Sequence, residues 1–217
     1  MKFLRRFLLI ILLLFVYGLL SDVMSIFLGG NYKFQSSFEF SIIEQIILMF
    51  VAVFSTLVIL ILLKKFILHY QFEINWKKKD IIVFFVALLI MEIIGHGGLF
   101  LLNYLKIGTT LNQDLLEQMF GSFNFFITLI IIGVCGPICE EVIFRAGIIY
   151  YLFEDFPFLG FIFSVIVFTV LQLPSNVVSL VMYGGVGLVL SLIYYKTKRL
   201  DLVIALHLVY NISMCLT

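Results

Sequence analysis

Long runs of hydrophobic residues, separated by short polar segments, dominate this 217-residue chain. A helix needs about 20 predominantly apolar residues to cross the hydrocarbon core of a bilayer. By this measure the chain contains seven candidate membrane helices, at residues 3–28, 40–63, 81–105, 124–153, 158–173, 177–195 and 200–216. The pattern therefore predicts an all-α, polytopic membrane protein with about seven transmembrane helices.

Three of these candidate helices are irregular. The fourth is longer than one crossing requires and contains Pro137, so we expect it to be bent or broken just before Glu140. The fifth is short and ends at the turn-like sequence of residues 173–176. The first follows a basic start like that of a signal peptide. It lacks a small-x-small cleavage site, so we interpret it as an uncleaved helix.

Composition supports a membrane protein and narrows its partners. Hydrophobic residues make up 63% of the chain and charged residues 12%, and the mean hydropathy is +1.20, well outside soluble usage. The net charge of +1 and the lack of a basic motif exclude nucleic acid as an expected partner. Without a linker or repeat, residues 1–217 are expected to form a single membrane domain, with three spans in 1–105 and four in 124–217.

Positive residues predict how the protein is oriented, because cytoplasmic loops carry an excess of Lys and Arg. With a cytoplasmic N-terminus, eleven basic residues fall inside: Lys2, Arg5, Arg6, Lys64, Lys65, Lys77, Lys78, Lys79, Lys196, Lys198 and Arg199. Only Lys33 and Lys106 fall outside, apart from Arg145 within the fourth span. The N-terminus is therefore predicted to be cytoplasmic and the C-terminus external.

Polar side chains inside the predicted spans are the candidate functional residues. One ionised side chain at the bilayer centre costs at least about 2.5–3.5 kcal/mol, so each needs a partner, a water-filled cavity or a function. The candidates are Glu92, His96, Glu140, Glu141, Arg145, Gln172, His207 and Asn211.

Helical spacing predicts which of these side chains can meet. Residues four apart share a helix face, which gives three pairs: Glu141 with Arg145, Glu92 with His96, and His207 with Asn211. Glu140 is turned about 100° from its neighbour Glu141, so it can face a cavity while Glu141 is held in an ion pair. Counting 1.5 Å per residue places Glu140 and Gln172 at a similar depth.

The order of these motifs resembles the CPBP intramembrane proteases, also called the CAAX-protease/bacteriocin-processing or Abi family. That family shows Glu-Glu-x-x-x-Arg, then Phe-x-x-x-His, then His-x-x-x-Asn in a later helix. This chain carries Glu140-Glu141-x-x-x-Arg145 and His207-x-x-x-Asn211, and the resemblance extends from about residue 124 to the C-terminus. The resemblance implies a membrane-embedded endopeptidase.

By position, the resemblance implies that Glu140 activates the attacking water while Glu141 and Arg145 hold the geometry. His207 and Asn211 would stabilise the oxyanion, and no cofactor is implied. The second motif departs from the family, because it ends in Gln172 where the family has histidine. Glutamine can hydrogen-bond water but cannot take its proton. Glu140 would then act as the base alone, or His96, paired with Glu92, would serve as an auxiliary.

Several alternatives use the same residues. The glutamates and Arg145 can form a purely structural ion-pair cluster, and His207 and Asn211 can provide interhelical hydrogen bonds. Cys135 and Cys139 with His207 can be drawn as a zinc site. A non-catalytic regulator or scaffold, with Gln172 marking lost chemistry, is the alternative function. A proton-coupled carrier is a third class, but it lacks the expected inverted repeat.

Together these observations predict an integral, multi-pass protein of a bacterial cell membrane. Its partners would be the lipid bilayer and a membrane-associated peptide or protein substrate, whose peptide bond it hydrolyses. The resemblance implies roles in peptide-signal or bacteriocin maturation, in bacteriocin self-immunity, or in the control of membrane proteins.

Overall fold

The computed structural model describes residues 2–27, 39–67 and 75–216, and the side chains of the same residues apart from 20–27. The described residues are all helical or in connections, with no strand, which confirms the predicted all-α fold. Lys33, counted in the orientation argument, lies outside them.

The α-helices are joined in places by π-helical segments, labelled η. The elements in chain order are α1 (Lys2–Phe27), α2 (Ile42–Leu62), η1 (Leu63–Ile67), α3 (Lys78–Tyr104), α4 (Leu111–Phe120), α5 (Phe125–Thr128), η2 (Leu129–Cys135), α6 (Gly136–Glu141), η3 (Val142–Leu152), α7 (Pro157–Leu171), α8 (Val177–Thr197) and α9 (Leu200–Cys215).

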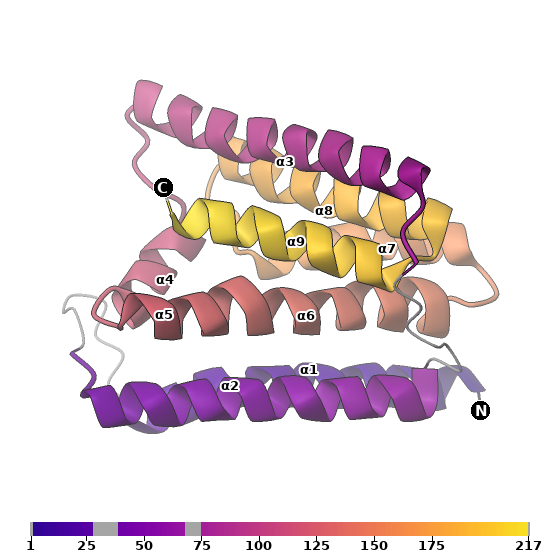
Figure 1. The fold of residues 1–217 in the computed structure, drawn as a ribbon, viewed down its shortest axis with the longest axis horizontal. Helices are drawn as coiled ribbons and strands as arrows, with labels where there is room; N and C mark the ends of the chain where they lie inside the picture. Colours follow the sequence, from indigo (N-terminus) through magenta and orange to yellow (C-terminus); the bar gives the residue numbers. More distant parts are fainter. Residues whose placement is uncertain (1, 28–38, 68–74, 217) are drawn as a thin grey trace.

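The long helices form a bundle around the segment from α5 to η3, which runs as one helix over residues 125–152. In Figure 1, α1 and α2 lie along one side of this helix, and α3, α7, α8 and α9 cover the other. The start of α1 and the end of α9 lie at opposite ends of the bundle. Helix 125–152 is therefore the central element, and it carries both adjacent glutamates.

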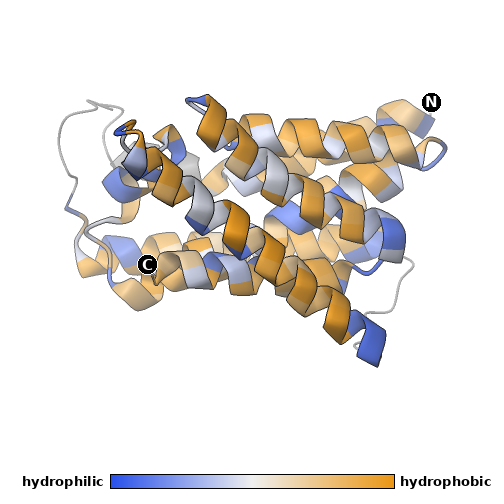
Figure 2. Ribbon diagram, turned by 90° about the horizontal axis from the view of Figure 1, so that it is seen from above, coloured by the Kyte–Doolittle hydropathy of each residue, from blue (hydrophilic) through white to orange (hydrophobic). Residues whose placement is uncertain are grey.

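Length and composition identify a multi-pass membrane protein. Among the residues that the structure describes, four helices are long and apolar enough to cross a membrane: Ile42–Ile67, Lys78–Tyr104, Phe125–Leu152 and Val177–Thr197. The helices Pro157–Leu171 and Leu200–Cys215 are apolar but shorter. Figure 2 shows hydrophobic residues along most of each helix and hydrophilic residues mainly near the ends. Each of the seven predicted segments corresponds to a helix, four of them with the length and composition of a span.

One helix, α4, was not predicted. Its sequence, LNQDLLEQMF, is too short and too polar for a membrane crossing, so a search for bilayer-length apolar runs passes over it. Its start does carry a local signal, because the side chain of Thr110 accepts a hydrogen bond from the backbone N–H of Gln113. Thr110 also contacts the hydroxyl of Tyr183 at 2.5 Å, which joins α4 to α8.

Helix 125–152 is not broken at Pro137, and the irregularity expected there takes the form of a change from π-helical to α-helical hydrogen bonding. The helix continues past Pro137 because the preceding turn is π-helical, with the Gly136 N–H bonded to the Ile131 carbonyl five residues earlier. In this pattern the next carbonyl, that of Ile132, would accept from residue 137, and proline has no N–H to offer. The Asn211 side chain donates to the Ile132 carbonyl instead, at 3.4 Å.

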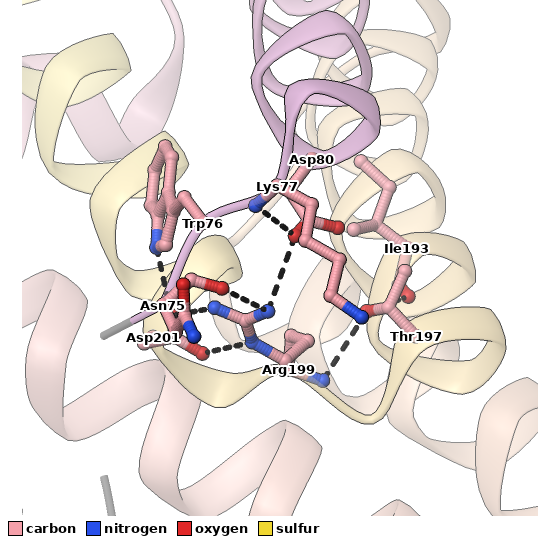
Figure 3. A network of polar contacts seen from close by, with 8 residues as sticks. All are labelled: Asn75, Trp76, Lys77, Asp80, Ile193, Thr197, Arg199 and Asp201. Carbon is pink, nitrogen blue, oxygen red and sulfur yellow. Dashed lines mark hydrogen bonds and ion pairs between the residues drawn. The ribbon is translucent and has the colours of Figure 1, made fainter. Parts of the chain in front are cut away.

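A polar network fastens the helix ends on the side where α1 begins (Figures 1 and 3). Arg199, between α8 and α9, donates to both carboxylate oxygens of Asp201, at 2.8 and 2.6 Å. It also contacts Asp80 in the first turn of α3, at 3.2 Å. The Trp76 indole donates to Asp201 at 2.8 Å. One guanidinium therefore joins the start of α3 to the start of α9.

We expect Arg199→Ala to destabilise the fold by about 1–3 kcal/mol, because it leaves two partly buried carboxylates without their charged donor. Arg199→Lys should recover only part of this loss, since a single ammonium cannot bond two carboxylates in this forked geometry. Unfolding in detergent would measure both effects. The control is Lys78→Ala, which removes an exposed basic residue at the same end of α3. Equal midpoints for Arg199→Ala and Lys78→Ala would contradict the prediction.

Candidate active site

The centre of the site is a fully buried ion pair between Glu141 and Arg145. Glu141 ends α6 and Arg145 lies four residues later in η3, with 3.1 Å between Oε1 and Nη1. Both side chains are 0% exposed. Glu141 Oε1 is also 2.7 Å from Nδ1 of His207 in α9. The predicted pairing of Glu141 with Arg145 is present, and it extends to a histidine from another helix.

Helices α7 and α8 enclose the guanidinium of Arg145. The central carbon of the guanidinium, Cζ, lies 4.6 Å from the centre of the Phe168 ring in α7, which is a cation–π contact. Its Nη2 donates to the Gly187 carbonyl in α8 at 3.4 Å. A Cβ at Gly187 would lie 2.7 Å from the Phe168 ring, so only glycine leaves room for this arrangement. The charge of Arg145 is thus held by an ion pair, a carbonyl and an aromatic face.

Glu140 faces a different direction from Glu141, as the helical turn predicts. Its Oε1 accepts a hydrogen bond of 2.8 Å from the hydroxyl of Tyr17 in α1. Its Oε2 is 3.9 Å from Nε2 of His207. That distance is too long for a hydrogen bond, but it allows one water molecule to contact both atoms. Glu140 is therefore held on one side, and its other oxygen faces an imidazole.

The site brings two carboxyl groups, one guanidinium and one imidazole together in the interior of the protein. Among the described residues, Glu141 Oε2 and Arg145 Nε are buried without a hydrogen-bond partner. Buried charged atoms of this kind normally bind a polar group.

Gln172 lies at the end of α7, with its side chain directed to α4. Its amide oxygen accepts a hydrogen bond of 2.9 Å from the Asn112 side chain. Among the described residues, Arg145 and His207 both contact the Phe168 ring, one turn before Gln172 in α7. Depth along the helix predicted that Gln172 would be level with Glu140. The helix ends at Leu171, however, so helical spacing does not set the direction of the Gln172 side chain.

His207 and Asn211 share one face of α9, but the structure gives them different partners. His207 bonds Glu141, and Asn211 donates to the Ile132 carbonyl left by Pro137. An amide group has a second hydrogen, so this contact leaves Asn211 one donor for another acceptor. Its role in stabilising an oxyanion stays a prediction.

Glu92 and His96 form the predicted pair in α3, at 2.9 Å between Oε2 and Nε2. The Ser213 hydroxyl of α9 donates to the other oxygen of Glu92 at 2.5 Å. The His96 side chain is 42% exposed, in contrast to 4% for His207. Ser213 therefore joins this pair to α9, and the auxiliary role of the pair stays a prediction.

The residues of the site do not provide a metal centre. In the described part of the chain no group of three or more His, Cys, Asp and Glu side chains is placed to hold a metal ion. The thiol of Cys139, drawn above as a zinc ligand, lies 3.3 Å from the Thr56 hydroxyl of α2. Cys135 is buried as well. The zinc alternative finds no supporting geometry.

Tyr17 was missed by the sequence reasoning, although it contacts Glu140 directly. It stands 123 positions before Glu140 in an apolar helix, and a single tyrosine among leucines carries no local signal. Phe168 was visible only as the first residue of the second motif. Gly187 belongs to none of the predicted motifs, although its carbonyl contacts Arg145.

Comparisons with known proteins find similarity in the part of the chain that carries the site. Residues 122–213 match the family model "Type II CAAX prenyl endopeptidase Rce1-like". The chain is 27% identical over 143 residues to UPF0177 protein YvdC of Lactococcus lactis, covering 64% of this chain and 54% of the relative. It is 36% identical over 85 residues to the protein named "Putative membrane peptidase YdiL" of Bacillus subtilis, covering 38% and 34%.

The chain spans about half and about a third of the lengths of these two bacterial relatives. No solved structure matches. The family match includes every predicted catalytic residue, from Glu140 to Asn211, and confirms the resemblance drawn from the motifs. Residues 122–213 of this chain are therefore similar to the Rce1-like type II CAAX prenyl endopeptidase family.

Proposed function

We propose that this protein is an intramembrane endopeptidase that hydrolyses a peptide bond of a membrane-associated peptide or protein. The observation that carries the proposal is the 3.9 Å separation of Glu140 Oε2 and His207 Nε2. Each group is held by a hydrogen bond on its other side: Glu140 bonds Tyr17, and His207 bonds Glu141. A carboxylate and an imidazole in this arrangement can hold a water molecule between them.

In the proposed reaction Glu140 takes a proton from that water while the water oxygen bonds to the substrate carbonyl carbon. The oxyanion that forms is stabilised by a hydrogen bond from the imidazole of His207 and by Asn211. Glu140 then gives its proton to the amide nitrogen, and the C–N bond breaks to release an amine and a carboxylic acid. Glu141 and Arg145 act as positioning residues, because they hold His207 and contribute the balancing charge.

The proposed topology has seven crossings and a cytoplasmic N-terminus in a bacterial cell membrane. Its support is the clustering of basic residues at one end of the bundle, where Arg6 pairs with Glu154 and Arg199 with Asp80. Maturation of a peptide signal or bacteriocin, or self-immunity, is the proposed class of role.

The proposal is tested by comparing protein termini in the membranes of cells that express the wild-type chain or Glu140→Gln at matched levels. We expect new termini with the wild type and none with Glu140→Gln, because glutamine keeps the shape but cannot take a proton. A full set of new termini with Glu140→Gln would overturn the protease assignment and favour a carrier or a scaffold.

Gln172 provides a second arm of the same experiment. We expect Gln172→His to preserve cleavage, because the side chain at this position contacts Asn112 rather than the groups assigned to catalysis. The control is Gln172→Leu, which removes the hydrogen bond to Asn112 altogether. If the wild type is inactive and Gln172→His becomes active, the alternative of a regulator that has lost its chemistry is correct.

A further inference from the structure

Helix α1 packs antiparallel to helix 125–152 with a regular register. Near its start, the Arg6 guanidinium lies 5.5 Å from the centre of the Tyr151 ring. Four residues later, Ile10 reaches Gly147. Seven residues after that, Tyr17 bonds Glu140. Steps of four and seven residues keep one helix face in contact, so these three contacts belong to a single continuous seam.

Gly147 allows the two helices to approach closely enough for this seam. A Cβ on residue 147 would lie 2.7 Å from Cδ1 of Ile10 and 3.3 Å from the Val142 carbonyl oxygen. Ile10 and Leu13 are buried along the seam. At the start of α1, Arg6 also pairs with Glu154 and Asp155. The position of the Tyr17 hydroxyl is thus fixed by packing along α1 and by ion pairs at its start.

The hydroxyl of Tyr17 determines which oxygen of Glu140 is free to react. It occupies Oε1 at 2.8 Å and leaves Oε2 on the side of His207. When Glu140 has taken a proton, Oε1 still accepts the tyrosine hydrogen bond if that proton sits on Oε2. The bond therefore favours the proton on the oxygen that faces the reacting groups.

We propose that Tyr17 is a positioning residue for Glu140, supplied by α1 from outside the matched family region of residues 122–213. This inference rests on the proposed peptidase function and extends it. It assigns to the N-terminal helix a part in the reaction besides anchoring the protein in the bilayer. The site is incomplete without α1.

The test compares Tyr17→Phe with Tyr150→Phe, which removes the same hydroxyl from an exposed tyrosine of helix 125–152. The probe is an internally quenched peptide ending in a farnesylated Cys-aliphatic-aliphatic-X sequence, cleaved in proteoliposomes. We expect Tyr17→Phe to lower kcat by about tenfold to 10²-fold, as for a misplaced reacting group, with KM unchanged. Tyr150→Phe should keep the wild-type kcat. An unchanged kcat for Tyr17→Phe, or an effect on KM alone, would overturn the inference.

A second variant and a spectroscopic measurement keep the test independent of folding and of the chosen peptide. Gly147→Leu should lower kcat in the same way, because a larger side chain moves α1 away from Glu140. In infrared difference spectra, the carboxyl band that disappears in Glu140→Gln should shift in Tyr17→Phe and stay in place in Tyr150→Phe. A band that does not move in Tyr17→Phe would overturn the inference even if the peptide is not cleaved.

The outcomes also separate this inference from the proposed function. If Glu140→Gln cleaves as fast as the wild type, the peptidase mechanism itself fails. If Glu140→Gln is inactive and Tyr17→Phe is fully active, the mechanism stands and only the role of Tyr17 fails.

Discussion

Replacing Arg145 with methionine should destabilise the folded protein by about 3–5 kcal/mol, the usual cost of removing one partner from a buried ion pair. Methionine fills a similar volume and packs well against the Phe168 ring. The loss therefore comes from Glu141, which stays at 0% exposure with one fewer positive charge beside it. His207 alone would then have to balance two carboxylates.

Stability in detergent or bicelles, measured by denaturant unfolding of the purified protein, checks this prediction. The double variant Glu141→Gln with Arg145→Met serves as the control, because it removes both charges of the pair. We expect it to be more stable than Arg145→Met alone, since replacing a whole buried ion pair is often neutral. A double variant that loses the sum of the two single effects would show that the pair is not coupled.

Replacing His207 with glutamine should lower kcat by about 10²–10³-fold, the effect of removing one oxyanion donor. The amide of glutamine can donate to Glu141 in place of Nδ1, so the buried carboxylate keeps a partner. It carries no positive charge, and it presents no second ring nitrogen towards Glu140. KM should change little, because the charge on the substrate develops only in the transition state.

The comparison for this variant is His96→Gln, the same change in a histidine paired with a carboxylate in α3. We expect a much smaller effect on kcat, because His96 contacts Glu92 at a half-exposed position and His207 lies between the two glutamates. Equal losses in the two variants would assign His96 a direct part in the reaction, as the auxiliary role drawn from the sequence proposes.

Much of the fold and half of the site follow from the sequence because they depend on local rules. Membrane helices are set by runs of apolar residues, so all seven predicted segments correspond to helices, with ends within a few residues. The Glu141–Arg145 and Glu92–His96 pairs follow from four-residue spacing on one helix. The contact of His207 with Glu141 joins two helices, and only the order of the motifs along the chain indicated it.

The contacts that the sequence did not reveal depend on how helices pack against one another. Tyr17 meets Glu140 because α1 lies beside helix 125–152 in one register, and no local pattern encodes that register. Asn211 bonds the Ile132 carbonyl because of a π-helical turn before Pro137, which apolar periodicity cannot indicate. The direction of Gln172 depends on where α7 ends and on α4, which was not predicted.

The π-helical segment before the glutamates gives the central helix a position where its length can change. A π-helical turn holds one more residue than an α-helical turn. Deleting a single residue within Leu129–Cys135 would therefore let that stretch relax to an α-helix while the residues on either side keep their places. The same deletion in the α-helical part Gly136–Glu141 would rotate one side of the helix against the other by about 100°. We therefore expect natural relatives and designed variants that lose one residue within Leu129–Cys135 to keep both carboxylates aimed at His207.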